Sequence, residues 1–268
     1  MSAWETTLSD GWRVVAWEGM RLCIAIPSYG RERLVGKHPL LAVANLVVEG
    51  DQVADYEGAL RPAHPEAHIV ACPVHGLAQT RNFILESAPE VTAVVQADDD
   101  LYAFRDVLLS TAEDIRDVEA ILGILFHTAL VTAELGLGVF GYHISGVIWE
   151  RRSYEPFLLQ NVVHAECIGI LDRTLRFDPE VALHDDVDFS LQAIRRYGAL
   201  LRHDRFCPLT LPHARQLGGL ARLRTAEAER RCYARLVAKW GPRVIRPGKR
   251  RGAGITLRVS PRAMFDPR

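Results

Sequence analysis

Short apolar runs alternate with helix-like stretches over the first hundred residues of the chain. The four runs are residues 22–26, 46–48, 68–72 and 91–97, and the stretch 76–86 after the third run has apolar residues at helical spacing. Strand-length runs that alternate with helices are typical of β-α-β units. The pattern therefore predicts an α/β fold, with a mostly parallel sheet flanked by helices.

Longer elements follow in the second half. Residues 113–135 predict an amphipathic helix, because six apolar side chains share one face: Ile115, Val118, Ile121, Leu122, Leu125 and Ala129. The other predicted elements are two β-rich segments and two helices, at 138–149, 161–171, 185–197 and 225–240. Gly198 is placed to end the helix 185–197, as glycine does at helix C-termini.

The chain shows no internal repeat, and we expect one domain over residues 1–241 with a basic tail over 242–268. The net charge is only −1, so no global field draws the protein to nucleic acid or to a membrane. From Lys239 onward, however, nine Lys or Arg residues face one acid, a local charge of +8. Such a tail is able to attract a polyanion, although basic tails are more often simply solvated.

Cysteine content and the apolar pattern indicate the compartment. The five cysteines are odd in number and form no C-x-x-C pair, which argues against a disulfide framework and a zinc site. The N-terminus has acids and tryptophans where a signal peptide has basic and then apolar residues, and no apolar stretch is long enough to span a bilayer. We expect a soluble cytoplasmic protein with no membrane contact.

Three consecutive carboxylates, Asp98, Asp99 and Asp100, end the apolar run 91–97. Adjacent negative charges are best tolerated on a solvated loop or around a divalent cation, and Mg²⁺ and Mn²⁺ prefer oxygen ligands. The carboxyl end of a strand in an open α/β sheet is where ligands bind, which favours the cation. On an extended segment Asp98 and Asp100 would project to the same side.

Several motifs occur in a recognisable order. Residues 24–31 read Ile-Ala-Ile-Pro-Ser-Tyr-Gly-Arg, Glu49 ends the second run, residues 76–82 read Gly-Leu-Ala-Gln-Thr-Arg-Asn, and the acids 98–100 precede His-Asp-Asp-Val-Asp-Phe at 184–189. This order resembles the nucleotide-diphosphosugar transferases of the GT-A fold, over about residues 21 to 240. The resemblance implies a nucleotide-sugar donor, with UDP-sugars preferred, and Mn²⁺ or Mg²⁺ as cofactor.

The resemblance also implies roles for individual residues. Asp100 would ligate the metal directly, Asp98 would contact the ribose or a metal-bound water, and His213 would lie on the metal or the diphosphate. The residues implied in donor binding are Pro27, Ser28, Tyr29, Arg31, Glu49, Gly76, Arg81, Asp98, Asp99, Gly219 and Arg222. Two alternatives stay open: Arg81 as a surface arginine paired with Glu86 or Asp98, and Gly219 with Arg222 as an ordinary turn with a solvated arginine.

The acceptor hydroxyl needs a carboxylate to take its proton. Asp185 and Asp186 begin a predicted helix, whose amino end stabilises negative charge, although acids there are often only caps. The resemblance favours Asp186 as the base; Asp185 stands where the family usually has Glu, so the choice between the two stays open. One direct displacement would give inversion at the anomeric carbon.

Within the fold, the chain is most similar to phage glycosyltransferases encoded beside TET-like dioxygenases. The similarity lies in Pro-Ser-Tyr-Gly-Arg at 27–31, the motif at 76–82, the acidic helix, and Gly-Gly at 218–219 followed by Lys-Trp-Gly at 239–241. It implies sugar transfer to 5-hydroxymethylcytosine in DNA, in the host cytoplasm if the protein is phage-encoded. The alternatives are a saccharide or small-molecule acceptor, a nucleotidyltransferase, and a non-catalytic nucleotide- or DNA-binding module.

Overall fold

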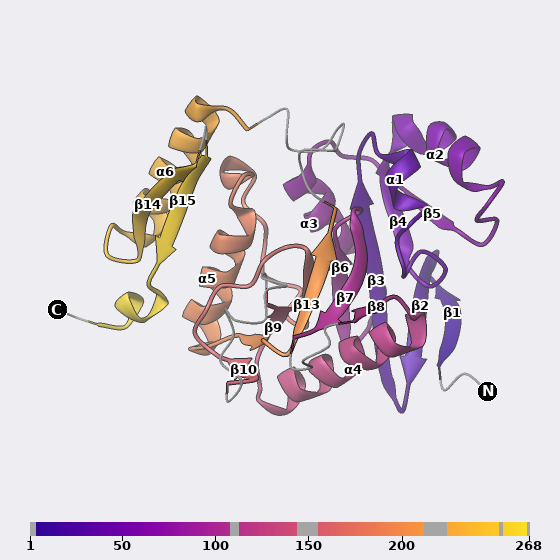
Figure 1. Cartoon of the computed structure of the whole chain (residues 1–268), viewed down its shortest axis with the longest axis horizontal. Coiled ribbons are helices and arrows are strands. Elements are labelled where there is room, and N and C mark those ends of the chain that lie inside the picture. Colours follow the sequence, from indigo (N-terminus) through magenta and orange to yellow (C-terminus); the bar gives the residue numbers. More distant parts are fainter. Residues whose placement is uncertain (1–3, 108–112, 144–154, 212–223, 252–253, 267–268) are drawn as a thin grey trace.

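The computed structural model describes residues 4–107, 113–143, 155–211, 224–251 and 254–266. Within these ranges ten strands form one mixed sheet, with helices on both faces (Figure 1). The strands of this sheet are β1 Glu5–Ser9, β2 Trp12–Trp17, β3 Met20–Ser28, β4 Asn45–Glu49, β5 His68–Cys72, β6 Ala93–Ala97, β9 Val139–Tyr142, β10 Phe157–Leu158, β11 Cys167–Ile170 and β12 Leu201–His203. The predicted α/β fold is confirmed.

Three of the four predicted strands lie inside the sheet, and the fourth, β5, is at an edge and pairs only with β4. β3 pairs in parallel with β4 and β6, and β4 pairs in parallel with β5, so all four end on the same edge. β3 is long enough to pair with two strands along one side: its first residues pair with β2 and its last residues with β4. β3, β4 and β6 are buried on both faces and therefore read as continuous apolar runs, which is why the sequence predicted them.

The second half of the chain extends the sheet with antiparallel strands. β11 pairs antiparallel with both β6 and β9, and β12 then pairs in parallel with β9. A smaller sheet has the order β13 Phe206–Thr210, β7 Leu101–Asp106 and β8 Asp114–Ile115. The parallel arrangement therefore holds for the centre of the sheet, and the whole is mixed.

Two apolar layers enclose the sheet. One joins alternate residues of β3, β4 and β6 to α2 Val53–Leu60 and α4 Val118–Glu134, beside the short helix α1 Glu32–Val35. The other joins the opposite faces of these strands to α3 Leu77–Ser87 and α5 Asp185–Tyr197. The period of two along each strand sends successive side chains to the two layers.

Helix ends follow local capping chemistry. α4 begins later than predicted, because the Asp117 side chain accepts the N–H of Ala120 and residues 114–115 are in β8. α5 has the predicted bounds and ends at Gly198, whose φ of 78° is the left-handed conformation that glycine favours. No helix in the described ranges is both long and apolar enough to cross a membrane.

The basic C-terminal segment is folded over its described residues. β14 Ile245–Arg251 and β15 Gly254–Val259 form an antiparallel hairpin beside α6 Ala226–Trp240, at the end of the molecule opposite the N-terminus (Figure 1). Val244 and Ile245 are buried in a third apolar cluster with Val187 and Leu191 of α5 and Leu236 of α6. Ile245 at the start of the hairpin, the preceding Val244 and α6 thereby cover one face of α5.

Candidate active site

The predicted site residues that the structure describes gather at one edge of the sheet. The parallel strands β3, β4, β5 and β6 all end there. Glu49 is the last residue of β4, and Arg31, Gly76 and the acids 98–100 follow β3, β5 and β6. The N-terminus of α5 reaches the same place, since Arg81 of α3 contacts both Asp98 and Asp185. This is the carboxyl edge of parallel strands, where α/β proteins bind ligands.

Asp99 is held in a buried network with the loop after β3. Arg31 Nη1 lies 2.6 Å from Asp99 Oδ1 and 3.5 Å from Asp100 Oδ2. Ser28 Oγ donates to Asp99 Oδ2 at 2.6 Å and lies 2.7 Å from the hydroxyl of Tyr56, which accepts the N–H of Arg31 at 3.0 Å. Burial raises the pKa of Asp99 against the opposing effect of Arg31, and raises that of Tyr56 to about 12.

Arg81 connects the acidic triplet to α5. Its side chain is only 2% exposed, and it lies 3.1 Å from Asp98 Oδ1 and 2.6 Å from Asp185 Oδ2. The guanidinium also lies over the ring of Phe177, 5.2 Å from its centroid. The sequence left open a surface arginine paired with Glu86 or Asp98. The structure shows the pair with Asp98, but the arginine is buried and its second partner is Asp185.

The two acids at the head of α5 have different environments. Burial raises the pKa of Asp185, and the charge of Arg81 opposes that rise. Asp186 instead contacts His164, with 3.1 Å between Oδ2 and Nδ1, and its Oδ1 accepts the N–H of Val187 at 2.8 Å. Burial alone would raise the pKa of Asp186, but the hydrogen bond and charge of His164 outweigh it and hold this pKa below its usual value.

Glu49 links the ends of β4 and β5. Its carboxylate accepts the N–H of Gly76 at 2.9 Å and lies 2.6 Å from His75 Nδ1. Gly76 has a φ of 96°, which L-residues rarely adopt, so the turn into α3 requires glycine. In the described part of the chain, Glu49, Asp51 and His75 are the set of three acidic and histidine side chains whose ligand atoms lie within 4.8 Å of one another.

The acidic triplet departs from the extended backbone that the sequence suggested. Asp99 and Asp100 lie in a turn, and the N–H of Leu101 donates to Asp98 O at 3.1 Å. Asp98 therefore faces Arg81 whereas Asp99 and Asp100 face Arg31. Carboxylates are the ligands that a hard cation prefers, and the Asp98 side chain is 34% exposed, but the acids 98–100 do not form a described set of three whose ligand atoms all lie within 4.8 Å of one another.

The remaining predicted residues are divided between surface, core and undescribed segments. Tyr29 is 52% exposed, whereas Pro27 is buried in β3. His213, Gly219 and Arg222 lie outside the described residues.

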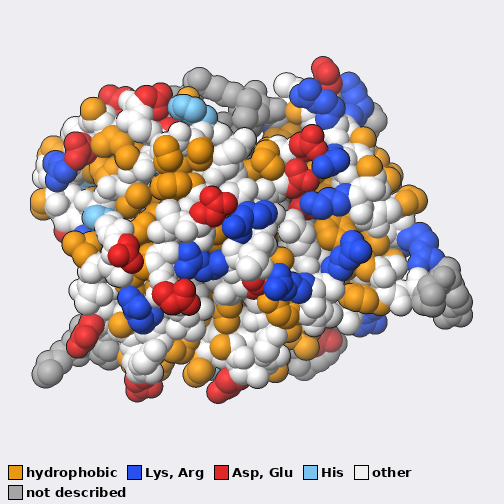
Figure 2. Space-filling model, turned by 180° about the vertical axis from the view of Figure 1, so that it is seen from behind, with side chains coloured by type: hydrophobic (Ala, Val, Ile, Leu, Met, Phe, Trp, Pro, Cys, Tyr) orange, Lys and Arg blue, Asp and Glu red, His pale blue; other side chains and the backbone are white. Residues whose placement is uncertain are grey.

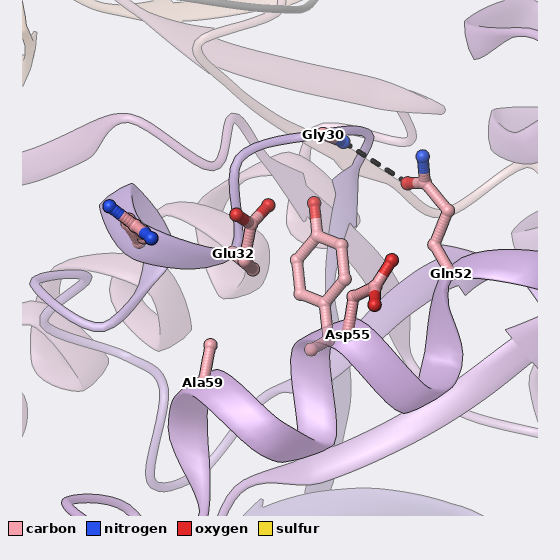
Figure 3. Close-up of a pocket in the computed structure, with 7 residues that line it drawn as sticks. Gly30, Glu32, Gln52, Asp55 and Ala59 are labelled. Atoms are coloured by element: carbon pink, nitrogen blue, oxygen red, sulfur yellow. Dashed lines mark hydrogen bonds between the residues drawn. The ribbon is translucent and has the colours of Figure 1, made fainter.

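A surface pocket opens on the other side of the loop after β3, between that loop and α2 (Figure 3). It has a volume of about 280 Å³, and Gln52, one of its lining residues, accepts the N–H of Gly30 at 3.1 Å. Its charged lining residues are Glu32, Arg33 and Asp55. None of the acids 98–100 lines it, so it adjoins the first loop rather than the acidic centre.

Sequence reasoning missed two side chains of this site, Tyr56 and His164. Tyr56 lies in the middle of α2 with no neighbouring motif, and its role depends on contact with Ser28. His164 lies in the segment before β11, and it reaches Asp186 because Val163 is hydrogen-bonded to Ser190 of α5. Neither contact can be predicted from the local amino-acid sequence.

Solved glycosyltransferases have a similar fold. Mannosyltransferase PcManGT from Pyrobaculum calidifontis, in complex with GDP-Man and Mn²⁺, matches with a TM-score of 0.52 and 14% identity, over 88% of this chain and 67% of that chain. Glucosyl-3-phosphoglycerate synthase from Mycobacterium tuberculosis, in complex with Mn²⁺, UDP and glucosyl-3-phosphoglycerate, matches with a TM-score of 0.51 and 16% identity, over 91% and 88%. No protein-family model and no curated protein sequence matches the chain. At such identities the similarity establishes the GT-A fold.

Proposed function

We propose that this protein is a glycosyltransferase that moves a sugar from a nucleoside diphosphate, preferably UDP, to a hydroxyl group. The observation that carries the proposal is the contact of Arg81 with both Asp98 and Asp185, because it unites the acids after β6 with the acids at the head of α5. The solved proteins of similar fold contain UDP or GDP-Man together with Mn²⁺ or Mg²⁺. Both facts support a donor site at this edge of the sheet.

The metal would be Mn²⁺ or Mg²⁺, held by Asp100 with Asp98 and His213. Leu211 donates its N–H to Asp100 O at 3.1 Å, so the end of β13 lies beside the acids, whereas His213 lies outside the described residues. When bound, the metal neutralises the charge that develops on the diphosphate leaving group.

The donor site would comprise the loops that end the parallel strands. Arg31 and Ser28 act by holding Asp99 in place, and Glu49 with Gly76 shapes the turn between β5 and α3. The full set of proposed donor-binding residues is Pro27, Ser28, Tyr29, Arg31, Glu49, Gly76, Arg81, Asp98, Asp99, Gly219 and Arg222.

Of the two acids at the head of α5, Asp186 rather than Asp185 would take part in removing the acceptor proton. Both carboxylates start α5, but Asp185 is committed to a buried pair with Arg81, whereas the Asp186 side chain is 18% exposed. A single displacement at this centre inverts the anomeric carbon. The anomer of the product, read by NMR, tests that stereochemistry.

The acceptor we propose is 5-hydroxymethylcytosine in DNA. The C-terminal part of the chain supplies exposed arginines, among them Arg243, Arg246 and Arg258. On the face in Figure 2, Lys and Arg side chains are more numerous on the half with the C-terminal elements, although acids lie among them. Phosphate contacts by such residues dominate affinity for nucleic acid.

The test is incubation of 5-hydroxymethylcytosine DNA with a panel of UDP-sugars and Mn²⁺, followed by mass spectrometry of the nucleosides. A hexose-sized gain on the modified base supports the DNA acceptor. Transfer only to a saccharide or a small-molecule hydroxyl keeps the glycosyltransferase and discards DNA. Release of pyrophosphate instead of UDP indicates a nucleotidyltransferase, and binding of UDP without any turnover indicates a non-catalytic module.

A DNA-binding measurement isolates the role of the C-terminal arginines. Replacing Arg243, Arg246 and Arg258 with Gln removes charge without removing the hairpin. The salt dependence of DNA affinity should then flatten by up to about 0.9 in log–log slope for each phosphate that the protein no longer neutralises. The matched control replaces three exposed arginines elsewhere, Arg61, Arg116 and Arg195. Equal slopes for the two triple variants would argue against DNA binding at the hairpin.

A further inference from the structure

The side chain of Asp186 contacts a histidine from another element. Nδ1 of His164 lies 3.1 Å from Asp186 Oδ2, and the side chains are 29% and 18% exposed. Among the described residues the other ring nitrogen, Nε2, has no hydrogen-bond partner. One nitrogen is thus held by a carboxylate, while the other is free to accept a proton.

The backbone around this pair is fastened to α5. The hydroxyl of Ser190, one turn beyond Asp186, accepts the N–H of Val163 at 3.1 Å. The same hydroxyl lies 2.7 Å from Asp186 O and 3.2 Å from Val163 O, and both Ser190 and the Val163 side chain are fully buried. His164 follows Val163 directly, so its Cα is fixed relative to Asp186 by buried hydrogen bonds and packing.

The carboxylate of Asp186 is poorly placed to be the proton acceptor itself. One of its oxygens accepts the N–H of Val187 at 2.8 Å, and the other lies on His164. Hydrogen bonds to the charged form of a carboxylate lower its basicity. A carboxylate in this position serves better to orient an imidazole, as the acid does in Ser-His-Asp triads.

We propose that His164 is the catalytic base of the sugar transfer and that Asp186 is its positioning residue. The inference rests on the proposed function, and it names the atom that receives the proton. The O–H bond of the acceptor breaks as its proton passes to Nε2 of His164. The oxygen forms the new bond to the anomeric carbon, and the bond from that carbon to the diphosphate breaks with its electron pair leaving on the nucleoside diphosphate.

The charged groups around His164 suit this role. Burial alone would lower the pKa of His164, but Asp186 of α5 and Glu166 of its own segment outweigh burial and the opposing Arg202 of β12, so the pKa lies above its usual value. A base is effective when its pKa is near the working pH. His184, the residue before α5, also acts to lower the pKa of Asp186.

The decisive variant is His164→Asn. The Asn amide places an N–H near the position of Nδ1, so it still donates to Asp186, but it has no basic nitrogen at Nε2. We expect kcat to fall by about 10²–10⁴-fold with UDP binding in Mn²⁺ unchanged. The matched control is His64→Asn, which alters another histidine paired with a carboxylate, Glu66, on the surface. We expect the control to retain wild-type kcat.

The pH profile separates catalysis from structure. In the wild type, kcat/KM should fall as the pH drops through the raised pKa of His164, because the imidazolium cannot accept a proton. His164→Asn should lose this acidic limb, whereas Asp186→Asn should keep a limb displaced toward about 6.5, the pKa of an ordinary histidine. If His164 had only a structural role, the acidic limb of the kcat/KM profile would remain in every variant that folds.

The outcomes distinguish a failure of the proposed function from a failure of the assignment of His164 as the base. A wild-type protein that releases no UDP from any UDP-sugar, with acceptor or with water, contradicts the proposed function itself. A wild-type protein that transfers sugar while His164→Asn retains full kcat and the acidic limb overturns only the assignment of His164. Loss of the limb in Asp186→Asn, with His164→Asn unaffected, would make Asp186 the base.

Discussion

Arg81 and Asp185 form a buried ion pair, with 2.6 Å between Nη1 and Oδ2 and side chains only 2% and 7% exposed. The two residues come from α3 and α5, on the same face of the sheet. Because Arg81 also reaches Asp98, the pair fixes the head of α5 relative to the acids after β6. Asp185 is thereby a structural acid, although it is adjacent in sequence to the one we place in the proton transfer.

Asp185→Asn should therefore destabilise the fold. The substitution keeps the shape of the side chain but leaves the buried Arg81 charge with Asp98 as its remaining acidic partner. Removing one member of a buried pair costs about 3–5 kcal/mol, and we expect the lower end because Asp98 remains. Urea denaturation measures the loss. An unchanged midpoint would show that the pair contributes nothing to stability.

Asp186→Asn should have the opposite profile. Asp186 is less buried than Asp185 and its partner His164 stays on the fastened segment, so we expect a smaller loss of unfolding free energy than in Asp185→Asn. Turnover should drop by about 10²–10⁴-fold while donor binding persists. Kinetics and denaturation of Asp185→Asn and Asp186→Asn, measured side by side, test whether Asp185 serves stability and Asp186 serves turnover. Matching kinetic losses without any difference in stability would refute it.

Asp100→Asn tests the cation site. The variant is nearly isosteric, so the turn after β6 should survive, but a neutral amide is a weaker ligand for Mn²⁺ than a carboxylate. We expect the Mn²⁺-dependent gain in UDP affinity, measured by calorimetry, to disappear. Asp55→Asn, at an exposed acid of α2, is the matched control. Full Mn²⁺ dependence in Asp100→Asn would remove Asp100 from the metal site.

Acid should destabilise the protein through His203. Burial lowers the pKa of His203 to about 4 from an ordinary 6.5, so between these values the unfolded chain binds the proton and the folded protein does not. The free energy of unfolding therefore falls as the pH drops from 6.5 to 4, by at most about 1.4 kcal/mol per unit for this group. Denaturation of His203→Gln across this range should show a shallower slope than the wild type. Equal slopes for the wild type and His203→Gln would contradict a lowered pKa of His203 in the folded protein.

The central fold was predictable because it is encoded locally. Buried parallel strands are apolar runs, and their shared direction brings Arg31, Glu49 and the acids 98–100 to one edge. Elements that lack this signature were missed. β1 is almost wholly exposed, and β14 lies in an Arg-rich segment that contains Pro247. The start of α4 was placed too early because Ile115 continues the apolar spacing through a short strand.

The contacts within the site were less predictable than its location. Residues 81 and 185 are 104 positions apart, and nothing in either motif states that Arg81 is buried between two acids. The turn at Asp99 and Asp100 depends on Ser28, Arg31 and Tyr56, which come from two other elements. Sequence motifs identified the chemical groups, whereas tertiary packing decides which group faces which.

The C-terminal hairpin has a consequence for how the protein is made. Val187 and Leu191, on the helix that carries Asp185 and Asp186, are covered by Val244 and Ile245. Because α5 ends at Tyr197, it is synthesised before Val244, and this apolar face stays uncovered until the C-terminal segment follows. A message cut short before the codon for Val244 would yield a chain with every acidic motif present and its helix α5 unsupported.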